Sequence, residues 1–311
     1  MIGFAIVAVI WSKVKSGGGG FADLGGFSWL PAIACVLLLP VNFFVDVRVW
    51  RTLLAGAGVT LSPRDAARAV LAGFSAAAIS PGGVGDFVGR VVRIPTEKRW
   101  ITGFAMALGR AADGAIICAV GVACALVMLP FTTGATDLWI RTVIVFGLPM
   151  IALLLGVYCA KGRMDWLSAR LARWPSLLHA LNLATDIPAR YRIEAFLGAS
   201  VRYVVFTTQF VLALSAFGVG GVGVPTLFAG TATVYLLRNV APPLTFMGLG
   251  VREAASVAVM GQLGVPEQSA LLASLLVFAT NLALPALMGI PYLLTPRNSV
   301  APIEGSEASH A

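Results

Sequence analysis

Charged side chains are scarce in this sequence. Only 12% of its 311 residues are Asp, Glu, Lys or Arg, whereas a soluble domain carries about 25%. Apolar residues make up 58% of the chain, and its mean hydropathy is +0.89. Such a chain has too little polar surface to cover a water-soluble globule. The composition excludes a soluble enzyme, a nucleic-acid-binding domain and a disordered protein, and it leaves an all-α polytopic membrane protein.

Histidine and paired cysteines are also rare. The two histidines, His179 and His310, lie in a connecting segment and in the polar tail, which argues against a His-based zinc site or a Ser-His-Asp triad. The four cysteines lie inside apolar runs without CxxC spacing, which is typical of small core residues. No Lys-Ser/Thr follows the glycines at 82–85, so these do not form a nucleotide-binding loop. We therefore expect no metal and no cofactor.

Long apolar runs dominate the chain, and a helix needs about 20 apolar residues to cross the hydrocarbon core. The first segment, 1–11, is apolar but short, and we interpret it as an incomplete span. We expect one transmembrane domain over 1–296 and a disordered polar tail over 297–311. The predicted spans are 29–47, 101–129, 140–159, 195–217 and 270–294.

Two further apolar stretches, 64–93 and 226–263, are interrupted by proline and glycine. Proline removes a backbone donor and glycine loosens a helix. In lipid such a break is tolerated only where the freed backbone groups face protein or water. Both stretches therefore predict re-entrant hairpins that line a cavity, with a kinked, fully spanning helix as the alternative. The residues at the breaks are Pro81, Gly82, Gly83 and Gly85 in the first and Pro242, Pro243, Gly248 and Gly250 in the second.

The two interrupted stretches resemble each other. At a shift of 162 positions several glycines, prolines and one arginine coincide, and a predicted span precedes and follows each stretch. We interpret this as an internal repeat, with repeat one at about 29–129, repeat two at about 195–294 and a cytoplasmic connector at about 161–194. The coinciding residues are Gly56 and Gly218, Gly58 and Gly220, Pro63 and Pro225, Pro81 and Pro243, and Arg90 and Arg252.

Basic residues gather in the loops on one side of the predicted spans. The segments flanking the first hairpin and the connector are rich in arginine, whereas 130–138 and 218–224 contain no Lys or Arg. Such an excess marks the cytoplasmic side of the cell membrane; Lys13 and Lys15 are exceptions. The first hairpin then enters from the cytoplasm and the second from outside. This order predicts an inverted repeat of span, broken re-entrant hairpin and span, as in many transporters.

Several charged residues lie within the predicted membrane segments. Each costs about 2.5–3.5 kcal/mol on insertion scales, so such residues pair or face a polar cavity. Asp86 and Arg90 have i,i+4 spacing, and Arg110 and Asp113 have i,i+3 spacing, so each pair can lie on one helix face. The candidate site residues are Asp86, Arg90, Arg110, Asp113, Arg238, Arg252 and Glu253.

These charges predict a site for an anionic head group between the two hairpins. Arg90 and Arg252 occupy the same position in both repeats, and arginine binds phosphate bidentately. Broken half-helices also present free N–H groups and a positive dipole end to an anion. The alternatives are that the paired charges only hold helices together and that both arginines extend to the membrane interface.

Three motifs carry a family resemblance. They are Arg-Val-Trp-Arg at 48–51, Ser-Pro-Gly-Gly-Val-Gly-Asp-Phe-Val-Gly-Arg at 80–90 and Gly-Leu-Gly-Val-Arg-Glu at 248–253. Over nearly its whole length the chain resembles the lysylphosphatidylglycerol synthase transmembrane-region family, also called flippase-like domain proteins. The resemblance implies movement of modified phospholipids between leaflets. It also implies that Asp86, where the family more often has Glu, with Arg90, Arg252 and Glu253, are the motif charges.

We therefore expect a lipid translocator rather than an enzyme. No soluble aminoacyl-transferase domain follows 294 in this sequence, so the resemblance favours transport or binding of lipid over lipid aminoacylation. The expected ligand is a membrane phospholipid or another lipid-linked anion, with no nucleic acid. One alternative is a membrane-embedded lipid-linked transferase that uses Asp86 or Glu253 as general base. Another is a non-catalytic, lipid-binding partner of a separate lipid-modifying enzyme.

Overall fold

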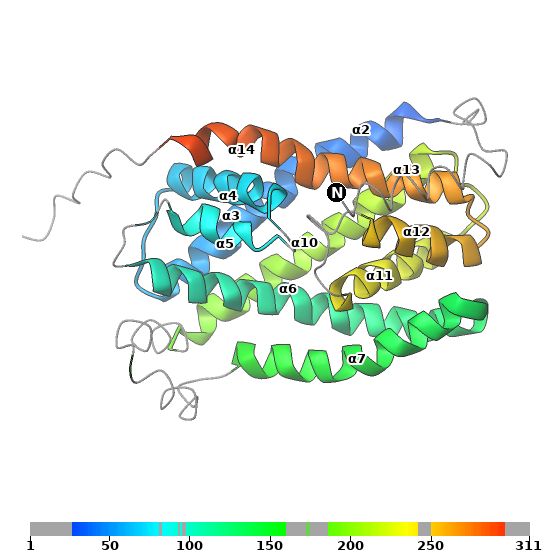
Figure 1. The fold of residues 1–311 in the computed structure, drawn as a ribbon, viewed down its shortest axis with the longest axis horizontal. Helices are drawn as coiled ribbons and strands as arrows, with labels where there is room; N and C mark the ends of the chain where they lie inside the picture. Colours follow the sequence, from blue (N-terminus) through cyan, green and yellow to red (C-terminus); the bar gives the residue numbers. More distant parts are fainter. Residues whose placement is uncertain are drawn as a thin grey trace, which may run out of the picture.

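The computed structural model describes residues 27–80, 83–92, 94, 98–159, 173, 186–241 and 250–295. Every regular element within these ranges is a helix, and no strand occurs there (Figure 1). The all-α fold predicted from composition is thus confirmed. Several predicted features lie outside the described residues: the first segment 1–11, most of the connector, the tail 297–311, and Pro81, Gly82, Pro242, Pro243 and Gly248.

Five helical stretches are long and apolar enough to cross a membrane, and they coincide with the five predicted spans. The observed helices are longer than predicted at several ends, because the charged residues at those ends are still helical. The stretches are α2 (Trp29–Leu37) with α3 (Leu39–Gly56), α6 (Arg99–Met128) with η3 (Leu129–Phe131), α7 (Gly134–Cys159), α10 (Ala189–Ala216), and α13 (Glu267–Phe278) with η4 (Ala279–Ala283) and α14 (Leu284–Leu294).

The first interrupted stretch forms two helices, α4 (Pro63–Ala78) and α5 (Gly85–Val92). Ser62 caps α4 by accepting a hydrogen bond from the Asp65 backbone N–H at 3.1 Å. A Cβ added to Gly89 would lie 2.4 Å from the Ala72 carbonyl oxygen, and one added to Gly85 would lie 2.1 Å from that of Ala76. The chain therefore reverses at the break, and only glycine allows the two backbones to approach this closely.

The second interrupted stretch forms α11 (Val224–Val240) and α12 (Val251–Gln262). A Cβ on Gly230, early in α11, would lie within 3.3 Å of Met260, late in α12. This pair is therefore also antiparallel, and neither stretch is a single kinked helix. Figure 1 shows α4 and α5 in the left half of the molecule and α11 and α12 in the right half.

The membrane span that follows each helix pair packs on the first helix of the other pair. α14 lies against α4, where a Cβ on Gly289 would come within 2.0 Å of the Leu71 carbonyl oxygen. α6 lies against α11, where a Cβ on Gly121 would be 2.6 Å from the Leu236 Cβ. This exchange makes the two halves interdependent. The inverted relation of the repeats stays a prediction.

Two helix ends refine the repeat alignment. Gly58 follows α3 and Gly218 follows α10, and both have φ of 77°. At both ends the N–H of the next residue, Val59 or Val219, bonds back to a carbonyl five residues earlier, as in a Schellman motif. The structural equivalent of Gly58 is thus Gly218, not Gly220 as the shift of 162 predicted. The loop before the following helix is longer in the second half.

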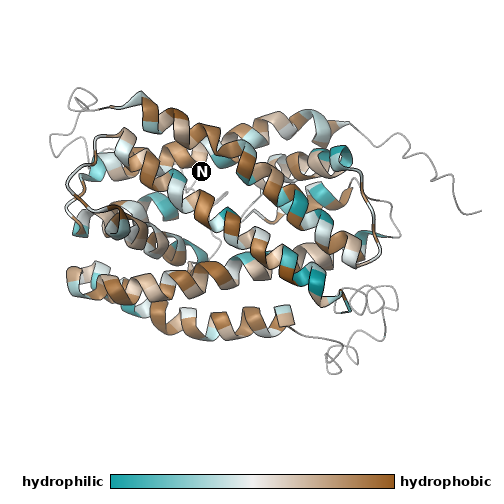
Figure 2. Cartoon of the chain, turned by 180° about the vertical axis from the view of Figure 1, so that it is seen from behind, coloured by the Kyte–Doolittle hydropathy of each residue, from teal (hydrophilic) through white to brown (hydrophobic). Residues whose placement is uncertain are grey.

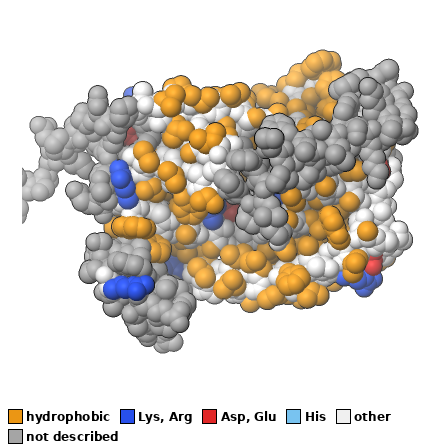
Figure 3. All heavy atoms as spheres, in the orientation of Figure 1, with side chains coloured by type: hydrophobic (Ala, Val, Ile, Leu, Met, Phe, Trp, Pro, Cys, Tyr) orange, Lys and Arg blue, Asp and Glu red, His pale blue; other side chains and the backbone are white. Residues whose placement is uncertain are grey.

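Hydrophobic residues occur along the whole length of the bundle (Figure 2), and many of them face outward. Outward-facing positions of α7 include Val145, of which 65% is exposed, and Leu153, of which 60% is exposed. Figure 3 shows hydrophobic side chains spread along the length of one face, with Lys or Arg side chains near its two ends and a few charged side chains near its middle. Such a belt suits lipid contact. A multi-pass membrane protein follows from the belt and the five spans.

The basic residues flanking the spans gather at one end of the bundle. α3 ends there, and α4, α6 and α10 begin there (Figure 1). At the opposite end Arg141 forms an ion pair with Asp137 at 2.8 Å, just beyond the predicted basic-free segment. The cytoplasmic assignment of the basic end stays a prediction. The residues at the basic end include Arg48, Arg51, Arg64, Arg68, Lys98, Arg99 and Arg190.

Candidate functional site

Six charged side chains from four helices form a closed ring of ion pairs, which we call the charge ring. Three aspartates and three arginines alternate around it, so each carboxylate lies between two guanidinium groups. The helices that contribute are α3, α5, α6 and α10. In ring order the members are Asp46, Arg90, Asp86, Arg110, Asp113 and Arg202, which returns to Asp46.

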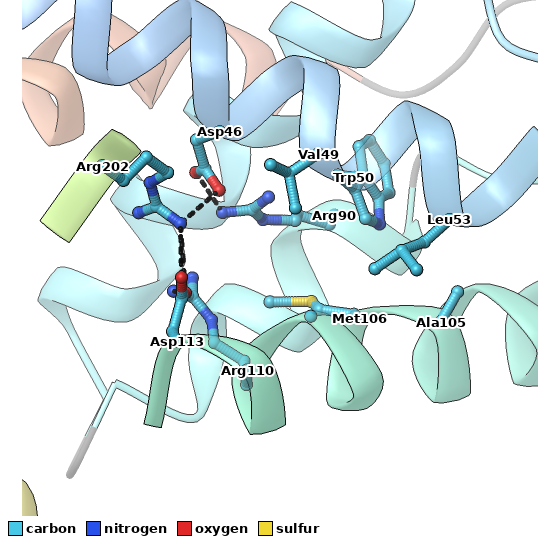
Figure 4. Close-up of a pocket in the computed structure, with 11 residues that line it drawn as sticks. Asp46, Val49, Trp50, Leu53, Arg90, Ala105, Met106, Arg110, Asp113 and Arg202 are labelled. Carbon is cyan, nitrogen blue, oxygen red and sulfur yellow. Dashed lines mark hydrogen bonds and ion pairs between the residues drawn. The ribbon is translucent and has the colours of Figure 1, made fainter. Parts of the chain in front are cut away.

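Arg90 is the most deeply buried arginine of the charge ring. Only 2% of its side chain is exposed, and it donates hydrogen bonds to Asp86 and Asp46, each at 2.8 Å. Its guanidinium also lies over the Trp50 ring, 5.6 Å from the centroid, within range of a cation–π contact. Figure 4 shows Arg90 between Asp46 and Trp50. A charge this deeply buried is tolerated because two carboxylates and an aromatic face surround it.

The opposite side of the ring is more open. Arg110 bonds to both Asp86 and Asp113, yet 39% of its side chain is exposed. Arg202 closes the ring at 3.0 Å from Asp113 and 3.1 Å from Asp46 (Figure 4). A pocket of about 20 Å³ adjoins the ring, which is space for about one water molecule.

The two ion pairs expected from helical spacing, Asp86 with Arg90 and Arg110 with Asp113, are both confirmed. Asp46 and Arg202 were not among the predicted site residues. Each is a charged residue inside a predicted span, which was a signal that it needs a partner. Their partners are distant in sequence, so no local spacing pointed to the closed ring.

A chain of amide hydrogen bonds extends the ring into the bundle. The Arg202 Nε donates to Asn42, which in turn donates to Asn281 at 2.9 Å. Asn281 donates to Gln209 at 3.0 Å, and Gln209 donates to the Cys35 carbonyl oxygen. Asn281 lies in η4, a π-helix. π-helical turns are frequent at functional sites.

Arg252 and Glu253 form a separate buried pair at the start of α12. Glu253 is 0% exposed, accepts hydrogen bonds from Arg252 and from Ser274, and also accepts one from the Gly250 N–H at 2.6 Å. The last bond caps α12, as an acidic residue at the third helical position does in a capping box. Arg252 corresponds to Arg90 in the alignment of the two repeats. It is the second residue of α12, however, and its carboxylate partner is the adjacent residue Glu253.

A cavity of about 560 Å³ lies between the two helix pairs. Pockets for small molecules are typically about 300–1,000 Å³. Residues of both pairs line it, together with residues of α6, α10 and η4. Arg90 and Glu253 are absent from its lining, because each lies behind a neighbouring charge. The charged residues that line it are Asp86, Arg110, Asp113, Arg202, Arg238 and Arg252.

Arg238 differs from the other charged residues of the cavity. It lies near the end of α11 and is exposed. Among the described residues it has no hydrogen bond or ion pair, whereas the other five lining charges are each paired. Asn239, next to it, also lines the cavity and donates to the Cys118 sulfur at 3.3 Å.

The fold and site define a class: polytopic α-helical membrane proteins with a charged cavity between two antiparallel helix pairs. The sequence model of the family described as "Lysylphosphatidylglycerol synthase TM region" matches residues 1–289. The chain therefore belongs to this family, and the resemblance drawn from its three motifs is confirmed. A comparison with curated proteins gave no match.

Proposed function

We propose that this chain is a lipid translocator of the cell membrane. The lipid head group occupies the 560 Å³ cavity while the acyl chains stay in the bilayer. The observation that carries the proposal is a head-group-sized, charged cavity between two helix pairs in a bundle with an apolar outer surface. Lipid tails need no such cavity, whereas a polar head group crossing the hydrocarbon core does.

The position of the cavity supports this role. Its lining comes from both helix pairs, which occupy opposite halves of the bundle (Figure 1). Figure 3 shows a small group of acidic and basic side chains near the middle of the otherwise hydrophobic face. Charges at that depth are costly unless they pair or serve a polar pathway.

The cavity geometry changes which arginines contact phosphate in the proposal. Arg90 was expected to hold phosphate, but its guanidinium is occupied by Asp46 and Asp86 and lies outside the cavity lining. Arg238 and Arg252 line the cavity. We assign phosphate contact to these two, and we assign to Arg90 the positioning of the charge ring.

Alternating access is proposed to come from movement of the two re-entrant hairpins. Close contacts through Gly85 and Gly89 tie α4 to α5, so that pair would move as a unit. The packing of α14 on α4 and of α6 on α11 would transmit the movement between halves. The inverted repeat is part of this proposal, because equivalent halves can exchange inward-open and outward-open arrangements.

The transferase alternative gains no specific support. Its general-base candidates, Asp86 and Glu253, are both in ion pairs with arginines, so their carboxylate oxygens already accept hydrogen bonds from guanidinium groups and are not free to take a proton from a substrate. A separate lipid-modifying enzyme as partner stays a prediction. The proposal for this chain is therefore non-enzymatic transport.

Filling the cavity tests the proposal. Asn239→Trp places a bulky side chain at a lining position that is exposed to the cavity. We expect it to abolish leaflet exchange of a fluorescent phospholipid in proteoliposomes, measured by dithionite quenching. Leu148→Trp, on the outer surface of α7, is the matched control and should exchange lipid like the unmodified chain. Unchanged exchange by a correctly folded Asn239→Trp variant would refute the role of the cavity.

A further inference from the structure

We propose that the cavity selects lipids whose head group has a net negative charge, such as a phosphodiester or phosphomonoester without an amine, and that Arg238 makes this selection. The inference rests on the proposed head-group site and names its substrate class. It goes beyond that site because a charged cavity alone could suit an anionic, a zwitterionic or a cationic head group. Which charged side chains of the cavity already have an ion-pair partner decides between these three head-group classes.

Among the residues that the structure describes, no carboxylate at the site is left for an ammonium group. In the charge ring each aspartate lies between two guanidinium groups. Glu253 is fully buried, holds Arg252 and caps α12. A cationic head group would have to displace an arginine from one of these pairs and leave its guanidinium without a carboxylate partner, which is unfavourable.

Arg238 offers the opposite situation. The charge ring contributes three arginines and three aspartates, and Arg252 is balanced by Glu253, so Arg238 gives the site a net charge of +1. The side chains that act on it electrostatically are Arg252, Arg110, Glu253 and the phenol Tyr235, so a single carboxylate stands against two guanidinium groups. The segment 242–249, which follows α11, contains no Asp or Glu in the sequence.

An anionic head group therefore completes the charge balance of the cavity. A phosphate oxygen at Arg238 would form a charge-assisted hydrogen bond, and the fork of the guanidinium suits bidentate binding. A zwitterionic head group would bring the same phosphate but also an ammonium, for which the described part of the site has no free carboxylate. We expect binding of the anionic class to be about 10-fold tighter than of the zwitterionic class.

Substitutions of Arg238 test the inference. Because Arg238 makes no hydrogen bond or ion pair among the described residues, Arg238→Gln removes charge without breaking an internal contact. Arg238→Glu gives the cavity a free carboxylate and should reverse the preference. Arg141→Gln, at the far end of the bundle and outside the cavity lining, is the control with the same change of charge.

The experiment measures binding apart from transport. The purified full chain in detergent is titrated with short-chain phosphatidylglycerol, phosphatidylcholine and lysyl-phosphatidylglycerol, with thermal unfolding as the readout. A polyprenyl phosphate arm and an inorganic phosphate arm show whether the anion must be a phospholipid, any lipid-linked phosphate or free phosphate. We expect phosphatidylglycerol to bind best, Arg238→Gln to weaken it about 10- to 100-fold, Arg238→Glu to favour the lysyl lipid, and Arg141→Gln to match the unmodified chain.

Equal binding of the three head-group classes, or unchanged selectivity in Arg238→Gln, would overturn the inference. The proposed function has its own readout, because leaflet exchange is measured separately in proteoliposomes. Selective binding without exchange would uphold the assignment of Arg238 and contradict translocation. Exchange without selectivity would uphold translocation and contradict the assignment of Arg238.

Discussion

Arg90 of α5 donates a hydrogen bond to Asp46 of α3 at 2.8 Å, and only 2% and 6% of the two side chains are exposed. The two residues are 44 positions apart. Their contact joins the first helix pair to the first span and closes the charge ring on its buried side. Folding of α5 therefore depends on charges contributed by other helices, since a helix of eight residues is unstable alone.

The charge ring predicts a large stability effect at Asp46. Asp46→Ala leaves Arg90 and Arg202 with one carboxylate fewer, and removing one partner of a buried ion pair costs about 3–5 kcal/mol. We expect a marked fall in the midpoint of thermal unfolding in detergent. Arg48→Ala breaks an exposed pair with Glu194 and should cost less than about 1 kcal/mol. Similar effects of the two substitutions would contradict the importance of the ring.

The contact of α14 with α4 predicts a steric effect at Gly289. A Cβ there would lie 2.0 Å from the Leu71 carbonyl oxygen and 2.4 Å from the Ser75 Oγ, so Gly289→Ala must push the helices apart. Overpacking costs about 1–3 kcal/mol, to be measured by denaturant unfolding in detergent. Gly103→Ala, where a Cβ would meet nothing within 4 Å, should instead stabilise α6 by up to about 1 kcal/mol. Equal effects of the two substitutions on the free energy of unfolding would show that α14 does not pack on α4 as described.

The helix ends predict equal effects at Gly58 and Gly218. Both have φ of 77°, and the left-handed conformation costs a residue with a Cβ about 1–2 kcal/mol. Gly58→Ala and Gly218→Ala should therefore lower the free energy of unfolding by similar amounts. Gly220→Ala, at a position without this backbone conformation and with open space for a Cβ, should have little effect. A large loss of unfolding free energy in Gly220→Ala alone would instead support the repeat alignment at a shift of 162, in which Gly220 is the equivalent of Gly58.

The distribution of basic residues predicts the orientation in the cell membrane. Single cysteines at Lys98 and Glu267 mark opposite ends of the bundle, and both positions are exposed. The background needs its native cysteines replaced, since Cys159 is exposed. With an impermeant maleimide on intact cells, we expect labelling of the Glu267→Cys variant only. Labelling of Lys98→Cys instead would place the basic end outside.

Local patterns were sufficient to predict the helices and the two local ion pairs. The five spans follow from runs of apolar residues, and the pairs of Asp86 with Arg90 and Arg110 with Asp113 follow from helical spacing. The breaks were also found, because proline and glycine act on the backbone next to them. Such features depend on neighbours within a few residues.

Long-range features could not be predicted in the same way. The bond between Arg202 and Asp113 joins residues 89 positions apart, and no spacing rule specifies such a contact. The different roles of Arg90 and Arg252 depend on where each stands in its helix, which the equal offset in the sequence did not reveal. That Arg238 has no partner among the described residues became visible only when every other charge lining the cavity had been assigned one.

The most direct test of the account is photo-cross-linking with a phospholipid whose photoreactive group lies on its head group. After irradiation in proteoliposomes, the labelled peptides are identified by mass spectrometry. The account predicts adducts on the cavity-lining parts of α6, α11 and α12, including the peptide with Arg238 and Asn239, and their loss in Asn239→Trp. Adducts confined to the outer surface of α7, unchanged in that variant, would contradict a head-group site between the two helix pairs.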